Sequence, residues 1–261
     1  MSEPLWVIQP NVFKEENYEI IYESLDRARI NFQIVDIEPF TRKLTPEVNH
    51  DGPIMVYGSA LLTKIAIERE WKPGTFSNEN FRHEAWVEHW GKECLNYDAK
   101  VFALNEAEFE GLQFVRPSKD LKSFSGQMVE GERFPFWREK LLAQSKHIPE
   151  DTNIIVAPLK NILTETRFFS ANGAVITGSI YRIGRNTIYK SDYAPQARIY
   201  AEQMIKIWQP ADAFVIDVAL MEDGNYKIIE TNCINCSGFY HADISKVIQT
   251  LDSFMVETSS S

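Results

Sequence analysis

The stretch from residue 214 to residue 232 constrains the fold of this chain more than any other, because it predicts a β-hairpin. Two apolar runs are joined at Asp223-Gly224, and Asp-Gly between apolar runs is a strong signal for a two-residue turn. Counting outward from that turn places Asp217 directly opposite Glu230. Asn232 lies on the same face as Glu230, because side chains alternate along a strand. One face of the predicted hairpin therefore carries two carboxylates and an amide.

The two facing carboxylates, Asp217 and Glu230, need a compensating charge. Directly opposed residues place their Cβ atoms about 4.5–5.5 Å apart, and like charges at that distance destabilise a strand pair. A bound cation would compensate, because Asp, Glu and Asn supply the oxygen ligands that Mg²⁺ prefers. The alternative is that one carboxylate is protonated or is held by a neighbouring Arg or Lys. Carboxylates gathered in apolar sequence are more often functional, so the metal site is favoured.

The N-terminal third predicts a parallel α/β unit. Its apolar and periodic segments are strands 5–8, 32–37 and 54–57 and helices 15–29 and 60–68. Strands that alternate with helices of this length form parallel βαβ units. Ser59 follows the third strand, where open α/β sheets bind ligands and helix amides face anions. The N-cap position of the next helix explains Ser59 equally well.

An aromatic, histidine-bearing stretch lies between residues 71 and 97. The spacing of Phe81, Trp86 and Trp90 fits a packed helix better than a cofactor site. A zinc or redox site is disfavoured, because a lone Cys-x-x-Cys pair lacks the second Cys or His pair that zinc sites usually have. The cysteines are Cys94, Cys233 and Cys236.

A basic loop stands out between residues 114 and 126 of this acidic chain, whose net charge is −10. Arg116, Lys119 and Lys122 are followed by serine and glycine residues. Cations and exposed backbone N–H groups together suit an anionic polyphosphate. The chain has no Walker A pattern, and a solvated charged turn is the alternative reading of this loop.

A second hairpin is predicted over residues 164–182, with Asn172-Gly173 as its turn. Counting outward places Arg167 opposite Gly178, whose missing side chain leaves room above the guanidinium group. Glu165 shares a face with Arg167. A surface Glu–Arg cross-strand pair, worth at most about 1 kcal/mol, is the alternative to a functional arginine.

These motifs together resemble the ATP-grasp superfamily over roughly residues 101–256. Ile216-Asp217-Val218 followed by Ile229-Glu230-Thr231-Asn232 resembles the metal-binding end of that fold, where a strand aspartate and Glu-x-Asn hold Mg²⁺ on the phosphates of ATP. Residues 114–117, Phe-Val-Arg-Pro, take the place of the family's strand ending in Val-Lys-Pro. Arg116 thus replaces the first phosphate-binding lysine, and an arginine can hold a phosphate with two hydrogen bonds.

The resemblance implies a role for each candidate residue. The metal ligands are Asp217, Glu230 and Asn232. ATP is expected to contact Arg116, Lys119, Lys122, Val156, Ala157, Leu159, Glu165 and Arg167. The catalytic arginines are Arg167 and Arg182. Candidate contacts to the acceptor substrate are Ser59, Asn235 and Ser237.

The resulting fold expectation is an α/β protein with an α+β ATP-grasp core. An N-terminal parallel α/β domain is expected over residues 1–92, and an ATP-grasp domain, whose antiparallel sheets clamp the nucleotide, over residues 93–257. Within the latter, residues 93–157 form the lid half and residues 158–257 the metal-bearing half.

The functional expectation is a ligase that uses ATP and Mg²⁺ to activate a carboxylate as an acyl-phosphate and to join it to an amine or thiol. Small molecules, peptides and proteins are all candidate substrates. The alternative is a regulatory module that binds a nucleotide without ligating. The acidic net charge argues against nucleic-acid binding, and no run approaches the ~20 apolar residues that span a bilayer. A cytoplasmic protein is expected, and the oligomeric state is left open.

Overall fold

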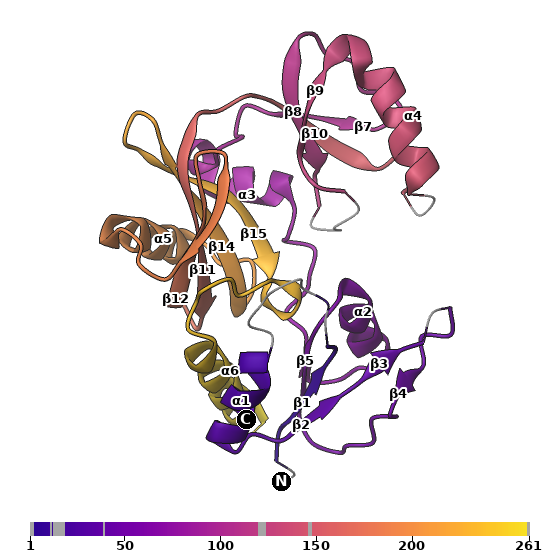
Figure 1. Ribbon diagram of the computed structural model, residues 1–261, viewed down its shortest axis with the longest axis vertical. Helices are drawn as coiled ribbons and strands as arrows, with labels where there is room; N and C mark the ends of the chain where they lie inside the picture. The colour runs from indigo at the N-terminus through magenta and orange to yellow at the C-terminus, as the bar shows by residue number, and fades with distance from the viewer. Residues whose placement is uncertain are drawn as a thin grey trace.

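The computed structural model describes residues 3–10, 12, 19–38, 40–119, 124–145 and 148–259. Figure 1 shows three bodies along the long axis: an N-terminal sheet near both termini, a central twisted sheet, and a small sheet with one helix at the far end. This mixture of parallel and antiparallel sheets with helices confirms the expected fold class. Among the described residues, no helix is both long enough and apolar enough to cross a bilayer.

The N-terminal body is a parallel sheet with strand order β2-β1-β5-β6. Its strands are β1 (Leu5–Ile8), β2 (Phe32–Ile34), β5 (Ile54–Tyr57) and β6 (Pro73–Gly74), and its helices are α1 (Glu19–Ala28) and α2 (Ala60–Glu68). The expected strand 32–37 is split by Val35, and its second part, β3 (Asp36–Ile37), pairs with β4 (Leu44–Thr45). The part of the expected helix at 15–18 lies outside the described residues.

Both faces of the N-terminal sheet are buried, as is usual for parallel sheets. Val7 and Val56 pack on the side of α2. Trp6 and Tyr57 belong to a second cluster, which also contains the apolar face of the last helix, α6 (Ile244–Ser259). The two ends of the chain therefore share one core, and the boundary expected near residue 92 stays a prediction.

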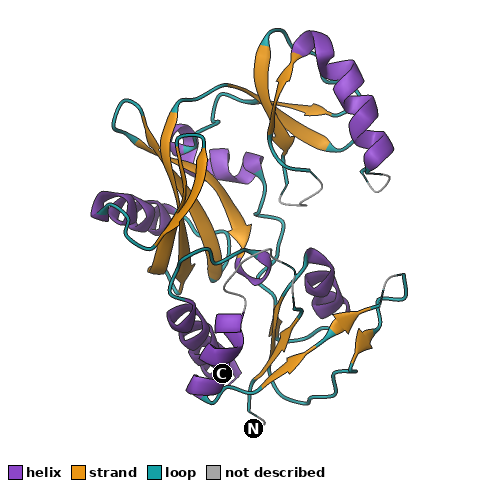
Figure 2. Ribbon diagram, viewed as in Figure 1, coloured by secondary structure: helices purple, strands orange, loops and turns teal. Residues whose placement is uncertain are grey.

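The lid body is an antiparallel sheet with strand order β7-β10-β8-β9. Its elements are β7 (Lys100–Ala103), β8 (Leu112–Pro117), β9 (Gln127–Glu130), α4 (Phe134–Gln144) and β10 (Asn153–Pro158). Helix α4 covers one face of this sheet (Figure 2), and Phe134 and Leu141 pack there against Val115 and Ile154. The lid sheet places Arg116, near the end of β8, at its border with the central sheet.

The central body is a five-stranded antiparallel sheet with strand order β13-β12-β11-β14-β15. Its strands are β11 (Ile162–Ala171), β12 (Ala174–Ile183), β13 (Asn186–Lys190), β14 (Ala213–Met221) and β15 (Tyr226–Cys233). On one face, Phe214, Ile216 and Val218 pack with residues of α3 (His83–Trp90) and α5 (Pro195–Ile207). Alternation turns Asp217 to the opposite face.

The turn of the β11–β12 hairpin is as predicted, but its register is not. Asn172 and Gly173 both have positive φ angles, 50° and 76°, as a type I′ turn requires. A bulge between Phe169 and Ser170 shifts the ladder by one residue, so Arg167 pairs with Ser179 and Phe168 pairs with Gly178. The predicted Arg167–Gly178 pair is therefore wrong. A Cβ atom on Gly178 would lie 2.5 Å from the Phe168 ring, so this glycine makes room for a phenyl ring.

The β14–β15 hairpin differs from the prediction near its turn and agrees with it at the site. The Gly224 N–H donates to the Met221 carbonyl at 3.0 Å, and Gly224 has φ +83°, which makes a three-residue loop in place of a two-residue turn. Ala219 therefore pairs with Lys227 and not, as that turn implied, with Ile228. A bulge between Asp217 and Val218 then restores the register, and the predicted pairing of Asp217 with Glu230 is confirmed.

Candidate active site

An ion pair between Arg167 and Asp217 lies at the centre of the polar face of the central sheet. The two residues are directly paired across β11 and β14. Arg167 Nε donates to Asp217 Oδ1 at 2.9 Å, and Arg167 Nη2 donates to Asp217 Oδ2 at 2.8 Å. Their side chains are only 9% and 1% exposed. Such a bidentate geometry is the strongest form of an arginine–carboxylate pair.

Burial dominates the electrostatics of this pair. Burial raises the pKa of Asp217 to about 6, with smaller raising contributions from Glu230 and Glu165, while Arg167 pulls that pKa down. Burial alone would lower the pKa of Arg167, but the charge and hydrogen bonds of Asp217 hold it well above its ordinary value. The sequence alternative, in which a neighbouring arginine holds one carboxylate, therefore describes the contacts of Asp217.

Glu230 is the more accessible of the two facing carboxylates. Its side chain is 28% exposed. Asn232 Nδ2 donates to Glu230 Oε1 at 3.0 Å, and Arg116 Nη1 donates to Glu230 Oε2 at 3.2 Å. The structure thus brings Glu230, Asn232 and Arg116 together, although Arg116 comes from the lid sheet and the other two come from β15.

Arg116 is buried with donors to spare. Its side chain is 9% exposed, and its Cζ lies 5.0 Å from the centre of the Trp86 ring. Among the described residues, Arg116 Nε and Nη2 and the neighbouring Trp86 Nε1 are buried without a hydrogen-bond partner. A buried donor without an acceptor costs free energy, most of all when it is charged. This cluster of unsatisfied donors is suited to an anion.

Helix α3 supplies the groups behind Arg116. Burial, and after it the charge of Arg116, lowers the pKa of His83 to about 4, so His83 is neutral at pH 7. Ser118 Oγ, two residues after Arg116, donates to Glu84 on the same helix. Sequence reasoning assigned this helix to packing and missed its contact with Arg116, because the contact joins segments far apart in the chain.

Glu165 and Arg182 form a second ion pair on the central sheet. Arg182 Nη1 donates to Glu165 Oε1 at 3.1 Å, and the two residues are paired across β11 and β12. Arg182 is 49% exposed while Glu165 is 9% exposed. The cross-strand pair that the sequence offered as an alternative is therefore present, and a contact of either residue with ATP stays a prediction.

The remaining ATP candidates lie around the junction of the two sheets. Lys119 is exposed and pairs with Glu79 at 2.6 Å. Lys122 lies outside the described residues. Val156 and Ala157 are buried in β10, whereas Leu159 is 42% exposed and lines a surface pocket of about 420 Å³ with the β14–β15 turn.

The three acceptor candidates have internal contacts. Ser59 Oγ accepts from the Leu62 N–H at 3.3 Å, which makes Ser59 the N-cap of α2. Asn235 Nδ2 donates to the Val56 carbonyl at 2.7 Å, and Asn235 Oδ1 accepts from the Phe76 N–H at 2.9 Å.

Ser237 Oγ likewise donates to the Cys233 carbonyl at 2.9 Å. Asn235 and Ser237 are both buried. These bonds stabilise the junction between the N-terminal and central sheets, and contact with an acceptor stays a prediction for all three candidates.

Two tyrosines beside Arg167 were not among the sequence candidates. The rings of Tyr181 and Tyr240 lie 5.7 Å and 4.9 Å from Arg167 Cζ. Tyr181 lies one position before the predicted Arg182, and Tyr240 closes the loop that leaves β15. A search for aromatic residues next to the predicted arginines could have found Tyr181, whereas Tyr240 needed the fold.

The cysteines are free thiols in the described structure. Cys94, Cys233 and Cys236 are all buried. The described residues contain no group of three or more His, Cys, Asp or Glu side chains that could hold a metal ion. A metal at the predicted position would therefore depend on the amide oxygen of Asn232 in addition to Asp217 and Glu230.

Comparison with known proteins places this geometry in a family. Residues 42–251, well over half of the chain, match the model of an ATP-grasp domain family, the third family of its clade. No curated protein sequence matches the chain.

Three solved structures share the fold. The D-cycloserine synthetase DcsG has a TM-score of 0.63 at 12% identity, covering 97% of this chain and 99% of that chain. D-alanine–D-alanine ligase from Bacillus anthracis has 0.62 at 10% identity, with coverages of 99% and 96%. The ATP-grasp ligase PsnB, complexed with a minimal precursor, has 0.57 at 10% identity, with coverages of 98% and 100%. This chain belongs to the ATP-grasp domain family that its sequence matches.

Proposed function

We propose that this protein is an ATP-dependent ligase that joins a carboxylate to an amine. The observation that carries the proposal is the unsatisfied guanidinium group of Arg116, buried beside Glu230 at the junction of the lid and central sheets. Family membership and the ligase folds of the three similar structures support the same activity. A phosphate group placed at this junction would accept the hydrogen bonds that Arg116 Nε and Nη2 do not make within the protein.

The donor set fits Mg²⁺ on its chemistry. Glu230 and Asn232 present hard oxygen atoms, and Glu230 is partly open to solvent. Asp217 lies directly opposite Glu230, and a carboxylate oxygen that accepts one hydrogen bond retains another lone pair. Glu230 and Asn232 would hold the ion, with Asp217 behind them. When bound, the ion neutralises charge on the transferring phosphoryl group.

The chain's own residues perform the positioning that phosphoryl transfer requires. A substrate carboxylate oxygen attacks the γ-phosphorus of ATP, the bond to the bridging oxygen breaks, and ADP leaves. Arg116 holds phosphate oxygens from the lid side. Arg167, fixed by Asp217, adds a positive charge at the centre of the sheet. An amine nitrogen then attacks the acyl carbon of the acyl-phosphate, loses its proton, and inorganic phosphate leaves.

The substrate class that we propose is an amino acid or a peptide. One similar structure is named D-alanine–D-alanine ligase, and PsnB has been solved with a precursor peptide. Both names support a carboxylate and an amine as the reacting groups, and a peptide or protein acceptor remains within the proposal.

Binding of ATP, with and without Mg²⁺, tests the nucleotide site by calorimetry. Wild type should bind ATP more tightly with Mg²⁺, and Glu230→Gln should remove this difference while retaining the fold by circular dichroism. Glu106→Gln, which makes the same charge change at an exposed lid residue, is the matched control. Equal binding by wild type and Glu230→Gln in Mg²⁺ would contradict the assigned metal site.

Release of ADP then separates a ligase from a nucleotide-binding module. ADP should appear only when a carboxylate and an amine are both supplied, and it is measured by a coupled assay across amino acids and short peptides. ATP binding without ADP release from any acceptor would favour the regulatory module.

A further inference from the structure

The backbone at Tyr240 is in a conformation that a tyrosine rarely adopts. Its φ angle is +55°, in the left-handed region. Glycine, asparagine and aspartate visit this region readily, whereas a bulky side chain does so only when the surrounding structure holds it there. A tyrosine at this position therefore indicates that its ring is held by contacts worth more than the backbone strain.

Those contacts surround Arg167. The Tyr240 ring stacks on Tyr181 at 5.2 Å and on Tyr189 at 5.0 Å, with interplanar angles of 27° and 16°. Tyr181 and Tyr240 both lie over the Arg167 guanidinium group, and the carbonyl of Gly238, in the same loop as Tyr240, accepts from Arg167 Nη1 at 3.4 Å. Arg167 is thus enclosed by one loop and one strand.

Asp217 and the tyrosines fix different features of Arg167. The two hydrogen bonds to Asp217 fix one edge of the guanidinium group. The rings lie against its face, where cation–π attraction is strongest for a desolvated cation. Burial, followed by the charges of Asp217 and Glu165, raises the pKa of Tyr181 well above its ordinary value, so the aromatic wall stays uncharged.

We propose that Tyr240 is a positioning residue, whose strained backbone and stacked ring hold the Arg167 guanidinium group in the plane in which it pairs with Asp217. The catalytic consequence rests on the proposed ligase function, since Arg167 is useful to phosphoryl transfer only if its charge is fixed before the reaction. The positioning itself does not depend on any substrate.

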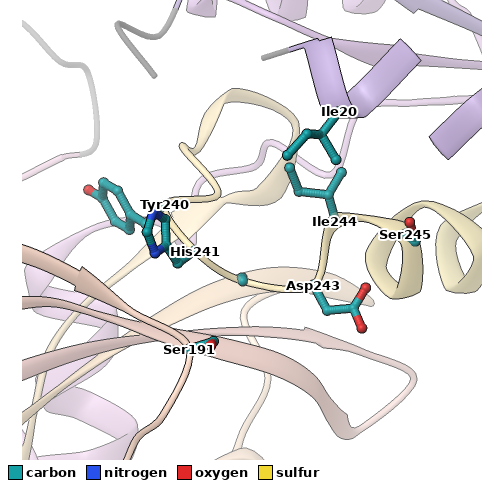
Figure 3. Close-up of a pocket in the computed structure, with 8 residues that line it drawn as sticks. Ile20, Ser191, Tyr240, His241, Asp243, Ile244 and Ser245 are labelled. Atoms are coloured by element: carbon teal, nitrogen blue, oxygen red, sulfur yellow. The ribbon is translucent and has the colours of Figure 1, made fainter. Parts of the chain in front are cut away.

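Tyr240 also borders open space, so its ring can be removed without leaving a sealed void. Figure 3 shows Tyr240 and His241 on one side of a surface pocket and Ile20 and Ile244 on the other. The pocket has a volume of about 310 Å³. Water can enter the space left by a smaller side chain, so Tyr240→Asn is expected to fold, the more so because asparagine tolerates the left-handed backbone.

Exchange of the Arg167 side-chain Nε–H with water tests the positioning directly by nuclear magnetic resonance, without ATP or acceptor. Its signal is identified by its loss in Arg167→Lys. Exchange should be slow in wild type and about tenfold to thirtyfold faster in Tyr240→Asn, the range that a lost cation–π contact implies. Tyr240→Phe, which keeps the ring, should restore slow exchange.

Phe40→Asn is the matched control. Phe40 is also an aromatic residue with a positive φ, +72°, but its side chain is fully exposed. This variant makes the same kind of change far from Arg167 and should leave the exchange rate unaltered. Unchanged exchange in Tyr240→Asn, or fast exchange in Tyr240→Phe, overturns the proposal.

The kinetic measurement uses the same variants once a substrate pair is known. Tyr240→Asn should lower kcat for ADP release about tenfold or more while KM for ATP changes less than about twofold. Tyr240→Phe should recover most of kcat. A fall confined to KM overturns the catalytic consequence, and a wild type without ligase activity removes the proposed function but leaves the exchange result to decide the positioning.

Discussion

Two buried arginines of this protein face carboxylates on the same sheet, and they are satisfied to different degrees. Arg167 places Nε and Nη2 on Asp217 and Nη1 on Gly238, and two tyrosine rings cover its face. Arg116 makes one hydrogen bond of 3.2 Å to Glu230, and its Nε and Nη2 have no acceptor among the described residues.

The difference teaches which arginine is complete without a ligand. The Arg167 site is finished by the protein itself, within one sheet and the loop that follows it, so it serves as a fixed charge. The Arg116 site is assembled between two sheets and left unsatisfied, so it needs an anion from outside. Substitutions at the two sites should therefore separate stability from binding.

The largest expected effect is the loss of stability on breaking the Arg167 pair. Asp217→Ala leaves a buried guanidinium group without its counter-ion, which typically costs about 3–5 kcal/mol. Urea unfolding monitored by circular dichroism measures this cost. The double variant Arg167→Met, Asp217→Leu should recover most of the stability, because it removes both charges. A double variant as unstable as Asp217→Ala would show that the pair is not the cause.

The pH dependence of stability sharpens the same site. The folded pKa of Asp217, about 6, lies above the ordinary carboxyl value of 3.8, so the folded state binds the proton more tightly than the unfolded state. The contribution of Asp217 to the unfolding free energy should therefore decrease as pH rises from about 4 to about 6. A shift of this size corresponds to roughly 3 kcal/mol at most. Unfolding curves of wild type and Asp217→Asn across this range measure the difference, and parallel curves would contradict the raised pKa.

The sequence predicted the fold well where local chemistry decides it. Asn172-Gly173 marks a hairpin turn because both residues accept positive φ angles, and strict alternation placed Asp217 opposite Glu230. The two bulges, one in each hairpin, could not be predicted, because a residue skipped in a strand ladder has no distinct composition. One bulge displaced Arg167 from Gly178, while the other restored the Asp217 register by compensating for the longer turn.

The sequence predicted the candidate site residues as types but not as contacts. Arg116 and Glu230 were each selected from their own segment, and their hydrogen bond appears only when the lid and central sheets are placed together. Trp86 was assigned to packing, and Tyr240 was not selected at all. Both touch their arginines through tertiary packing between distant segments, which no local pattern encodes.

Removal of Arg116 should show the reverse of the Asp217 result. Arg116→Met removes unsatisfied buried donors, and Glu230 keeps Asn232 and partial exposure to solvent, so stability should change by less than about 1 kcal/mol. ATP affinity should fall about tenfold to a hundredfold, because a charged hydrogen bond to phosphate contributes about 1.5–3 kcal/mol. Calorimetry with Mg·ATP measures the affinity. Unaltered affinity would mean that the unsatisfied arginine does not bind the nucleotide.

The smallest expected effect belongs to the exposed end of the basic loop. Lys119 reaches solvent and pairs with Glu79 at 2.6 Å, an interaction that lowers the pKa of the Glu79 carboxyl first through its hydrogen bond and then through its charge. Even if Lys119 turns toward a phosphate, solvent screens its charge, so Lys119→Gln should weaken ATP binding only about twofold at physiological salt. The same titration at low salt should enlarge the effect, whereas the Arg116→Met effect should change little because Arg116 is buried. A tenfold loss for Lys119→Gln at both salt concentrations would place Lys119 in the closed site beside Arg116, and the contrast between a completed and an uncompleted arginine would then extend to a basic loop that closes over the phosphates.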